Sequence, residues 1–156
     1  GAGSQIISAL ASGAAGVVIG TRFLTAEEIP AHPDYKQALV AATERDTALT
    51  MRSVRNTVRT LRNETTDKVQ AMEAADPGIG IEALLPYVSG AIGRRAYETG
   101  DVTQGMLSAG QSLGLVDGMA PLSVLVSQLE HEAQTALERL HRRAADNQAT
   151  MASPTR

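Results

Sequence analysis

Apolar residues recur every three or four positions along most of the chain, a spacing that places them on one face of an α-helix. The pattern is most regular over residues 121–145, where it predicts a long helix with Pro121 in its first turn. Its apolar face consists of Leu122, Leu125, Val126, Leu129, Ala133, Leu137 and Leu140. We expect the leucines of this face to pack against protein, and Glu130, His131 and Glu138 to face water or the rim of a partner.

Shorter helices are predicted elsewhere from the same spacing and from capping residues. They cover residues 5–11, 34–43, 53–63, 64–75 and 81–97. Ser4 is the expected N-cap of the first helix, and Gly13 is the residue expected to end it. Pro86 is expected either to break the helical segment around it or to open a second helix there.

One segment departs from helical spacing. Gly16-Val17-Val18-Ile19-Gly20 is a continuous apolar run between glycines. Such a run is typical of a strand that is buried on both faces of a parallel sheet. No other part of the chain looks like a parallel neighbour for this strand. We therefore expect Val17 to Ile19 to be buried between parallel strands wherever the rest of such a fold is present.

The glycines around this predicted strand are candidates for binding an anion. Glycine lets a backbone approach a phosphate closely, and unpaired N–H groups at the start of a helix bind anions. Thr21 adds a hydroxyl donor just past the predicted strand. Loops after the seventh and eighth strands of (β/α)8 barrels commonly build such a phosphate site. From spacing alone, a glycine-rich turn and a buried strand without any ligand are the favoured interpretation, because short glycine patterns are weak signals.

Further residues make this segment resemble a known family. Gly1-Ala2-Gly3-Ser4-Gln5-Ile6, followed by residues 9–24 (ALASGAAGVVIGTRFL), resembles the end of the barrel in the nitronate monooxygenases, formerly called 2-nitropropane dioxygenases. The resemblance extends to about Leu140. It continues through Thr25-Ala26-Glu27-Glu28, His32-Pro33-Asp34-Tyr35-Lys36, Leu61-Arg62-Asn63, Gly100-Asp101-Val102 and Ser108-Ala109-Gly110-Gln111-Ser112.

The resemblance implies an α/β fold, namely the C-terminal part of an FMN-binding (β/α)8 barrel whose last strand is followed by a mostly α-helical region. Residues 1–24 would hold the last barrel helix and strand with part of the flavin phosphate site, and residues 25–100 a helical and loop region. Residues 101–146 would form a cap segment and the long C-terminal helix, and residues 147–156 a flexible tail. A whole barrel needs about 200 residues or more. The missing N-terminal part of the barrel is therefore an expected partner.

The resemblance also implies where the cofactor binds. The expected cofactor-binding residues are Val18, Ile19, Gly20 and Thr21 at the end of the eighth strand, with Gly1 and Gly3 at the flank of the seventh-strand loop. Ser108 and Gln111 are carried over to the periphery of the flavin site. The family's catalytic base, a histidine on an earlier barrel loop, has no counterpart here, so no catalytic residue is expected in this chain.

For the whole protein, the resemblance implies an FMN-dependent nitronate monooxygenase. The reaction would be the oxidation of an alkyl nitronate by O2 to a carbonyl compound and nitrite, with FMN, the nitronate and O2 as partners. An NAD(P)H-dependent flavin reductase of the same fold, acting on enoyl-ACP or quinone, is one alternative. The other is an inactive, mostly helical fragment that binds a partner through its final helix.

The remaining candidate groups have simpler interpretations. His32 is expected to be a surface or capping histidine. Glu138 and His141 have the spacing of half a di-iron site, but no second pair exists, and we expect no metal. Arginines 52, 55, 59 and 62 would form a basic stripe on a helix, which we expect to be solvated and paired with acids rather than to bind a phosphate. Asn63-Glu64-Thr65 matches a glycosylation sequon to which we attach no meaning.

The amino-acid composition further limits the functions that this protein could have. Lys and Arg number 14 against 17 Asp and Glu, for a net charge of −3, which argues against broad binding of nucleic acid. Cysteine is absent, which removes disulfides and thiol chemistry and fits a cytoplasmic protein. No apolar run approaches the ~20 residues of a membrane span, so we expect no membrane contact. A homodimer is allowed but not required.

Overall fold

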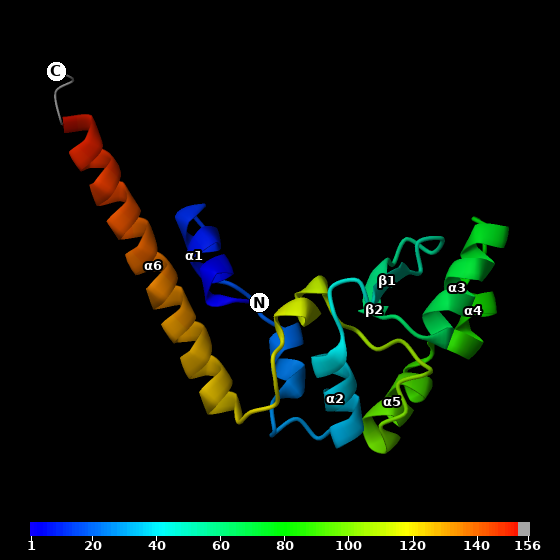
Figure 1. The fold of residues 1–156 in the computed structure, drawn as a ribbon. Helices are drawn as coiled ribbons and strands as arrows, with labels where there is room; N and C mark the ends of the chain where they lie inside the picture. The colour runs from blue at the N-terminus through cyan, green and yellow to red at the C-terminus, as the bar shows by residue number, and fades with distance from the viewer. Residues whose placement is uncertain (153–156) are drawn as a thin grey trace. The chain divides into compact units, whose positions relative to one another are not determined.

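The computed structural model describes residues 1–152, with side chains through Gln148, and is mostly helical (Figure 1). The elements are α1 (Gly3–Ala11), η1 (Thr21–Thr25), α2 (Pro33–Ala41), β1 (Thr47–Thr50), β2 (Val58–Leu61), α3 (Glu64–Ala75), α4 (Ile81–Val88), α5 (Gly90–Thr99), η2 (Gln111–Leu115) and α6 (Leu122–Ala152), where η denotes a 3₁₀ helix. They form two compact units, Gly20–Leu122 and a unit that joins Gly1–Ile19 to the segment beginning at Ser123.

In the first unit, the N-terminal end of α1 touches α6. A Cβ atom on Gly3 would collide with the backbone nitrogen of Ala133, so only glycine allows this approach. The Gly3 N–H donates to Glu132 Oε2 at 2.7 Å. A carboxylate is favourable at this position because the start of a helix carries partial positive charge.

The end of α1 matches the sequence prediction, but its start differs. Gly13 has φ +93°, and the N–H groups of Gly13 and Ala14 donate back to carbonyls of the last helical turn, as in a Schellman motif. The predicted N-cap, Ser4, lies inside the helix, and Ala2 is the capping residue. Ala2 has no side-chain acceptor, and its own N–H donates to Gln5 Oε1 at 3.0 Å.

The predicted strand at residues 17–19 does not form in this structure. Val18 is fully exposed and Val17 is 40% exposed. A strand needs hydrogen-bonded neighbours for its N–H and C=O groups. The sheet found among the described residues is a two-stranded antiparallel hairpin in the other unit. The described residues therefore supply no parallel neighbour for this segment.

The prediction of a helix over residues 53–63 is wrong, because part of this segment is strand β2. In the β1–β2 hairpin, Thr47 pairs with Leu61 and Thr50 pairs with Val58. Val58 and Thr60 are β-branched and favour a strand. The turn between the strands holds Met51 at φ +60°.

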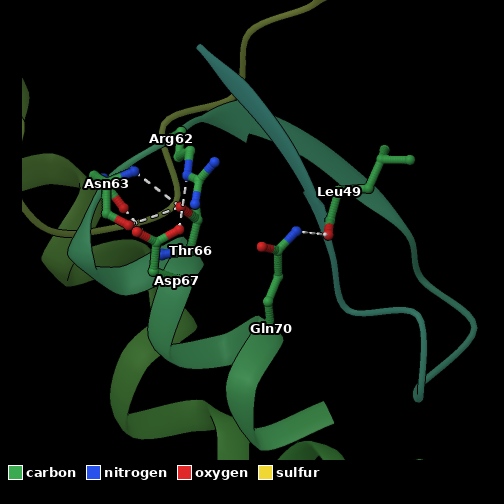
Figure 2. A network of polar contacts seen from close by, with 6 residues as sticks. All are labelled: Leu49, Arg62, Asn63, Thr66, Asp67 and Gln70. Carbon is green, nitrogen blue, oxygen red and sulfur yellow. Dashed lines mark hydrogen bonds and ion pairs between the residues drawn. The ribbon is translucent and has the colours of Figure 1, made fainter. Parts of the chain in front are cut away.

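The basic stripe expected on that helix is consequently absent. Arg52 and Arg55 are exposed in the turn between the strands. Arg59 donates to a threonine hydroxyl within the hairpin at 2.8 Å. Arg62 forms the expected pair with an acid, since its Nε donates to Asp67 Oδ1 at 2.9 Å (Figure 2).

A small apolar core holds the second unit together. Its buried members are Tyr35, Leu39, Leu61, Ala96, Leu107, Ala109 and Leu113. The Tyr35 and Tyr97 rings lie 4.6 Å apart, and their hydroxyl oxygens are 3.3 Å apart. Burial raises the pKa of the Tyr35 hydroxyl. Figure 1 shows α2 beside α5 around this core, and α3 beside α4.

Asn63 joins the start of α3 to the segment at residues 102–105. Its Oδ1 accepts from the Thr66 N–H at 3.0 Å, which caps the helix. Its Nδ2 donates to the carbonyls of Val102 and Gly105 at 3.1 and 2.9 Å. Figure 2 shows this cap, and one turn further along α3 the side chain of Gln70, which donates to a carbonyl of β1 at 2.9 Å. The sequon amide is thus occupied by structural hydrogen bonds.

The helical segment around Pro86 contains two helices, but the break falls after the proline. Pro86 lies inside α4, and α5 begins after Ser89, which has an extended backbone.

His32 is a capping histidine as expected, since its Nδ1 accepts the Asp34 N–H at 3.2 Å at the start of α2.

The predicted apolar face of α6 is buried only in part. Leu125 and Leu129 are 2% and 4% exposed, whereas the other three leucines of that face are about half exposed: Leu122, Leu137 and Leu140. The three polar residues expected to face water are exposed. The helix continues to Ala152, past its predicted end at Ala145, and residues 153–156 of the expected tail lie outside the described part of the chain.

Truncating Leu129 should destabilise the purified protein far more than truncating Leu137. Leu129→Ala removes a buried side chain and should lower the free energy of unfolding by about 2 to 5 kcal/mol. Leu137→Ala, on the same helix at 40% exposure, should cost about 0.5 kcal/mol. Urea unfolding followed by circular dichroism measures both. Equal losses would show that the buried face of α6 is assigned incorrectly.

Candidate functional site

The residues expected at the flavin site are divided between the two units. The second unit holds Gly20, Thr21, Ser108 and Gln111, and the first holds Gly1, Gly3, Val18 and Ile19. The structure brings together the members in the second unit, although the segments that carry them are far apart in the sequence.

A hydrogen bond joins Thr21 to the Ser-Ala-Gly-Gln segment. Thr21 is the first residue of η1, and Gly110 directly precedes η2. The Gly110 N–H donates to Thr21 Oγ1 at 3.0 Å. A threonine hydroxyl can accept and also donate. Since the Gly110 N–H uses an acceptor position, the Thr21 O–H stays available as a donor, and no described residue accepts it.

Arg22 holds the other end of η2. Its side chain is buried at 4% exposure, and its NH1 donates to the Leu115 carbonyl at 3.3 Å. Its NH2 lies 4.0 Å from Asp117 Oδ1. Two adjacent residues of η1 therefore fix both ends of η2.

Gly20, which directly precedes Thr21 in the chain, has open space where a side chain would lie. Gly20 is exposed, and a Cβ atom placed on it would meet no atom within 4 Å. Its φ of −107° is accessible to other residues. The absence of a side chain is therefore not required by packing among the described residues.

Ser108 lies on an extended segment that pairs with β2, a pairing that the sequence analysis missed. The Leu61 N–H donates to the Leu107 carbonyl at 2.8 Å, and the Ala109 N–H donates to the Arg59 carbonyl at 3.2 Å. Leu107 and Ala109 are buried and Ser108 is exposed, the alternation of a strand with one buried face. The alternation of apolar and polar residues at 107–109 is the signal that could have predicted it.

The expected site residues of the first unit have fewer contacts that indicate a ligand than those of the second unit. The Gly3 N–H is engaged by Glu132, and the glycine is needed for the close approach to α6. A Cβ atom on Gly1 would lie 3.6 Å from the Ile19 side chain, an ordinary contact distance. The roles of Gly1, Gly3, Val18 and Ile19 in cofactor binding remain predictions.

The described residues give little support for a metal site, a membrane span or a second ligand pocket that includes the expected flavin-site residues. They contain no group of three or more His, Asp or Glu side chains that could hold a metal. None of their helices is long and apolar enough to cross a membrane. Depressions of about 400 and 390 Å³ lie along α3, and the expected flavin-site residues line neither of them.

Comparison with known proteins decides the family. The sequence model of a family described as nitronate monooxygenase matches residues 1–132. The chain belongs to the nitronate monooxygenase family. This confirms the resemblance found in the sequence.

Individual relatives in this family are longer than the chain. It is 31% identical over 141 residues to the nitronate monooxygenase of Paraburkholderia phytofirmans, covering 88% of this chain and 37% of that protein. It is 29% identical over 123 residues to the probable nitronate monooxygenase of Staphylococcus saprophyticus, covering 79% and 34%. The chain thus spans about a third of the length of these relatives.

The fold of this chain is also similar to that of solved structures. The structure of FabK from Thermotoga maritima matches with a TM-score of 0.81 and 32% identity, over 91% of this chain and 44% of that one. A nitroalkane oxidase from Streptomyces ansochromogenes matches with a TM-score of 0.67 and 29% identity, over 89% and 38%.

Replacing the Thr21 hydroxyl should destabilise the nitronate monooxygenase segment even without any ligand. Thr21→Val leaves the Gly110 N–H without its acceptor and should lower the free energy of unfolding by about 1 to 3 kcal/mol. Thr21→Ser keeps the oxygen and should stay close to the wild type. Urea unfolding of the purified protein compares the two variants. Equal stability of both would mean that the Gly110 bond contributes nothing.

Proposed function

We propose that the complete gene product containing this chain is an FMN-dependent nitronate monooxygenase. It would oxidise alkyl nitronates with O2 to carbonyl compounds and nitrite. The proposal includes a (β/α)8 barrel whose last strand contains Val17 to Ile19, completed by the N-terminal part of the barrel, and a cytoplasmic location. The observation that carries it is the available Thr21 hydroxyl beside Gly20 in a chain of this family.

The residues around Thr21 fit the phosphate of FMN. A phosphate needs hydrogen-bond donors and room for its oxygens. The Thr21 O–H is an unused donor among the described residues, and the space beside Gly20 is open. Backbone N–H groups around Gly20 and Thr21 would add further donors.

The hydrogen bond from Gly110 explains how the Thr21 donor is oriented. The Gly110 N–H approaches one side of the hydroxyl oxygen, so the hydroxyl hydrogen must lie on another side. Threonine is also β-branched and therefore restricted at χ1. We infer that the Thr21 O–H is directed in advance at a phosphate oxygen, which reduces the ordering that binding requires.

When bound, FMN supplies the redox chemistry, and the chain supplies anchoring and orientation. Thr21 and Gly20, with Val18, Ile19, Gly1 and Gly3, are proposed to anchor the phosphate end. Ser108 and Gln111 are proposed to lie at the periphery of the flavin site. Both side chains are exposed, and Gly110 links their segment to Thr21. The catalytic base is proposed to lie outside this chain.

An NAD(P)H-dependent flavin reductase acting on enoyl-ACP or quinone is the second candidate. The match to FabK at a TM-score of 0.81 supports this second candidate. It shows that the proteins with a fold similar to this chain include one that is not named for nitronate or nitroalkane oxidation. Two assays separate the candidates: nitrite release from propionate-3-nitronate under O2, and NADH oxidation with a quinone. Nitrite release alone supports the first function, and NADH oxidation alone supports the second. A purified complete gene product without flavin absorbance would contradict both.

Substitutions at Thr21 and Gly20 should weaken FMN binding by the complete gene product in a defined order. Thr21→Val should lower the affinity by about one to two orders of magnitude, the cost of one hydrogen bond to a charged group. Thr21→Ser should retain most of the affinity. Gly20→Val should be worse than Thr21→Val, because its side chain would occupy the space proposed for the phosphate. Isothermal titration of FMN into each apoprotein measures these changes.

Two further variants make this comparison specific. Thr57→Val makes the same chemical change at an exposed residue of the hairpin turn and should leave FMN affinity unchanged. In Gly20→Ala the added Cβ meets no atom of the described chain beyond its neighbours in sequence, and a loss of affinity smaller than that of Gly20→Val is expected. Unchanged affinity in both Thr21→Val and Gly20→Val would remove the phosphate from this segment.

A further inference from the structure

We propose that Arg22 is a positioning residue of the phosphate site, which acts by holding η2 in place and does not contact the cofactor. This inference rests on the proposed function. It assigns a role to Arg22, for which the sequence alone predicts none.

The direction of the Arg22 side chain separates it from a ligand-binding arginine. The side chain is 4% exposed, and its NH1 is directed at the Leu115 carbonyl, 3.3 Å away. The Asp117 carboxylate lies 4.0 Å from NH2 on a largely exposed side chain. A buried cation is costly unless it is paired and hydrogen-bonded. The guanidinium therefore favours the conformation in which η2 ends beside it.

Holding η2 matters because this helix is short. It has five residues, and 3₁₀ hydrogen bonds have poorer geometry than α-helical ones. Within it, the Leu113 N–H donates to the Gly110 carbonyl at 3.1 Å, and the Val116 N–H donates to the Leu113 carbonyl at 2.9 Å. The buried Leu113 side chain anchors its middle.

The two ends of η2 are thereby coupled. Arg22 restrains the C-terminal end at Leu115, and Thr21 accepts from Gly110 at the N-terminal end. If Arg22 is removed, η2 can shift along η1, and the Gly110 N–H loses its register with the Thr21 oxygen. The Thr21 hydroxyl then loses the partner that orients it toward the phosphate.

Arginine and lysine should differ at this position. The planar guanidinium presents several donors in a fixed fork and can serve Leu115 and Asp117 together. A lysine keeps the charge on a single ammonium group. Positioning predicts that Arg22→Lys behaves like Arg22→Met, whereas a purely electrostatic role predicts that lysine restores function.

The first experiment tests the hydrogen bond between Gly110 and Thr21 in the absence of flavin. Amide hydrogen exchange at Gly110 is measured in the apo form of the complete gene product, with Arg62→Lys as a matched control on an exposed, ion-paired arginine. Arg22→Met and Arg22→Lys should each accelerate exchange at Gly110 by about tenfold or more, and the control should not. Unchanged Gly110 exchange in both Arg22 variants overturns the inference.

The second experiment measures the FMN dissociation constant of the same proteins. Arg22→Met and Arg22→Lys should weaken FMN binding by roughly three- to tenfold, while Arg62→Lys stays within about twofold. The dependence of affinity on salt should keep its slope in Arg22→Met, since no direct contact between Arg22 and phosphate is lost. The double variant Thr21→Val/Arg22→Met should bind no more weakly than Thr21→Val alone.

Three results would contradict the role of Arg22: restored affinity in Arg22→Lys, additive losses in the double variant, or lower thermal stability with unchanged FMN affinity. If Arg22→Met does not fold, Arg22→Lys carries the same exchange and affinity tests. A wild-type protein that binds no FMN overturns the proposed function itself. Unchanged exchange at Gly110 in a protein that does bind FMN overturns only the role of Arg22.

Discussion

The hydrogen bond from the Gly110 N–H to the Thr21 hydroxyl is the interaction on which the candidate site depends. It joins residues 89 positions apart and fixes the start of η2 against the start of η1. Arg22 and the buried Leu113 then hold the rest of η2. Because the bond uses the Thr21 oxygen as an acceptor, it leaves the hydroxyl hydrogen for a ligand. In the proposed site, one side chain thus combines a structural contact with a ligand-binding group.

The sequence predicted the helices well where apolar spacing and capping residues agreed. Glu64–Ala75 is helical as expected, with Asn63 as its cap, and Gly13 ends α1. The prediction of a helix over residues 53–63 was wrong, because part of this segment forms strand β2, paired with β1. The β-branched residues of β2 were the better signal.

The predicted strand at residues 17–19 shows a different limit. A continuous apolar run indicates that a segment is buried in its complete fold, but a strand forms only beside another strand. Among the described residues that neighbour is missing, and Val18 is exposed. Tertiary partners, and not local propensity, decide the structure of such a segment.

The residues of the site came from the family resemblance, whereas their arrangement came from the structure. Spacing along the chain could not show that Gly110 bonds to Thr21. It also could not show that Arg22 is buried, since arginines are mostly exposed. All three residues lie in the two segments that carry the family resemblance, Gly20 to Phe23 and Ser108 to Gln111, so the resemblance marked the right segments without revealing the contacts between them.

We propose that Thr21 recognises the phosphate of a flavin nucleotide rather than its ring. The most direct measurement is the ratio of the affinities for FMN and riboflavin, which differ by this phosphate, in the complete gene product and its Thr21→Val variant. We expect a large preference for FMN in the wild type and a ratio about ten- to a hundredfold smaller in the variant, with riboflavin affinity unchanged. An equal loss of affinity for both ligands would contradict it.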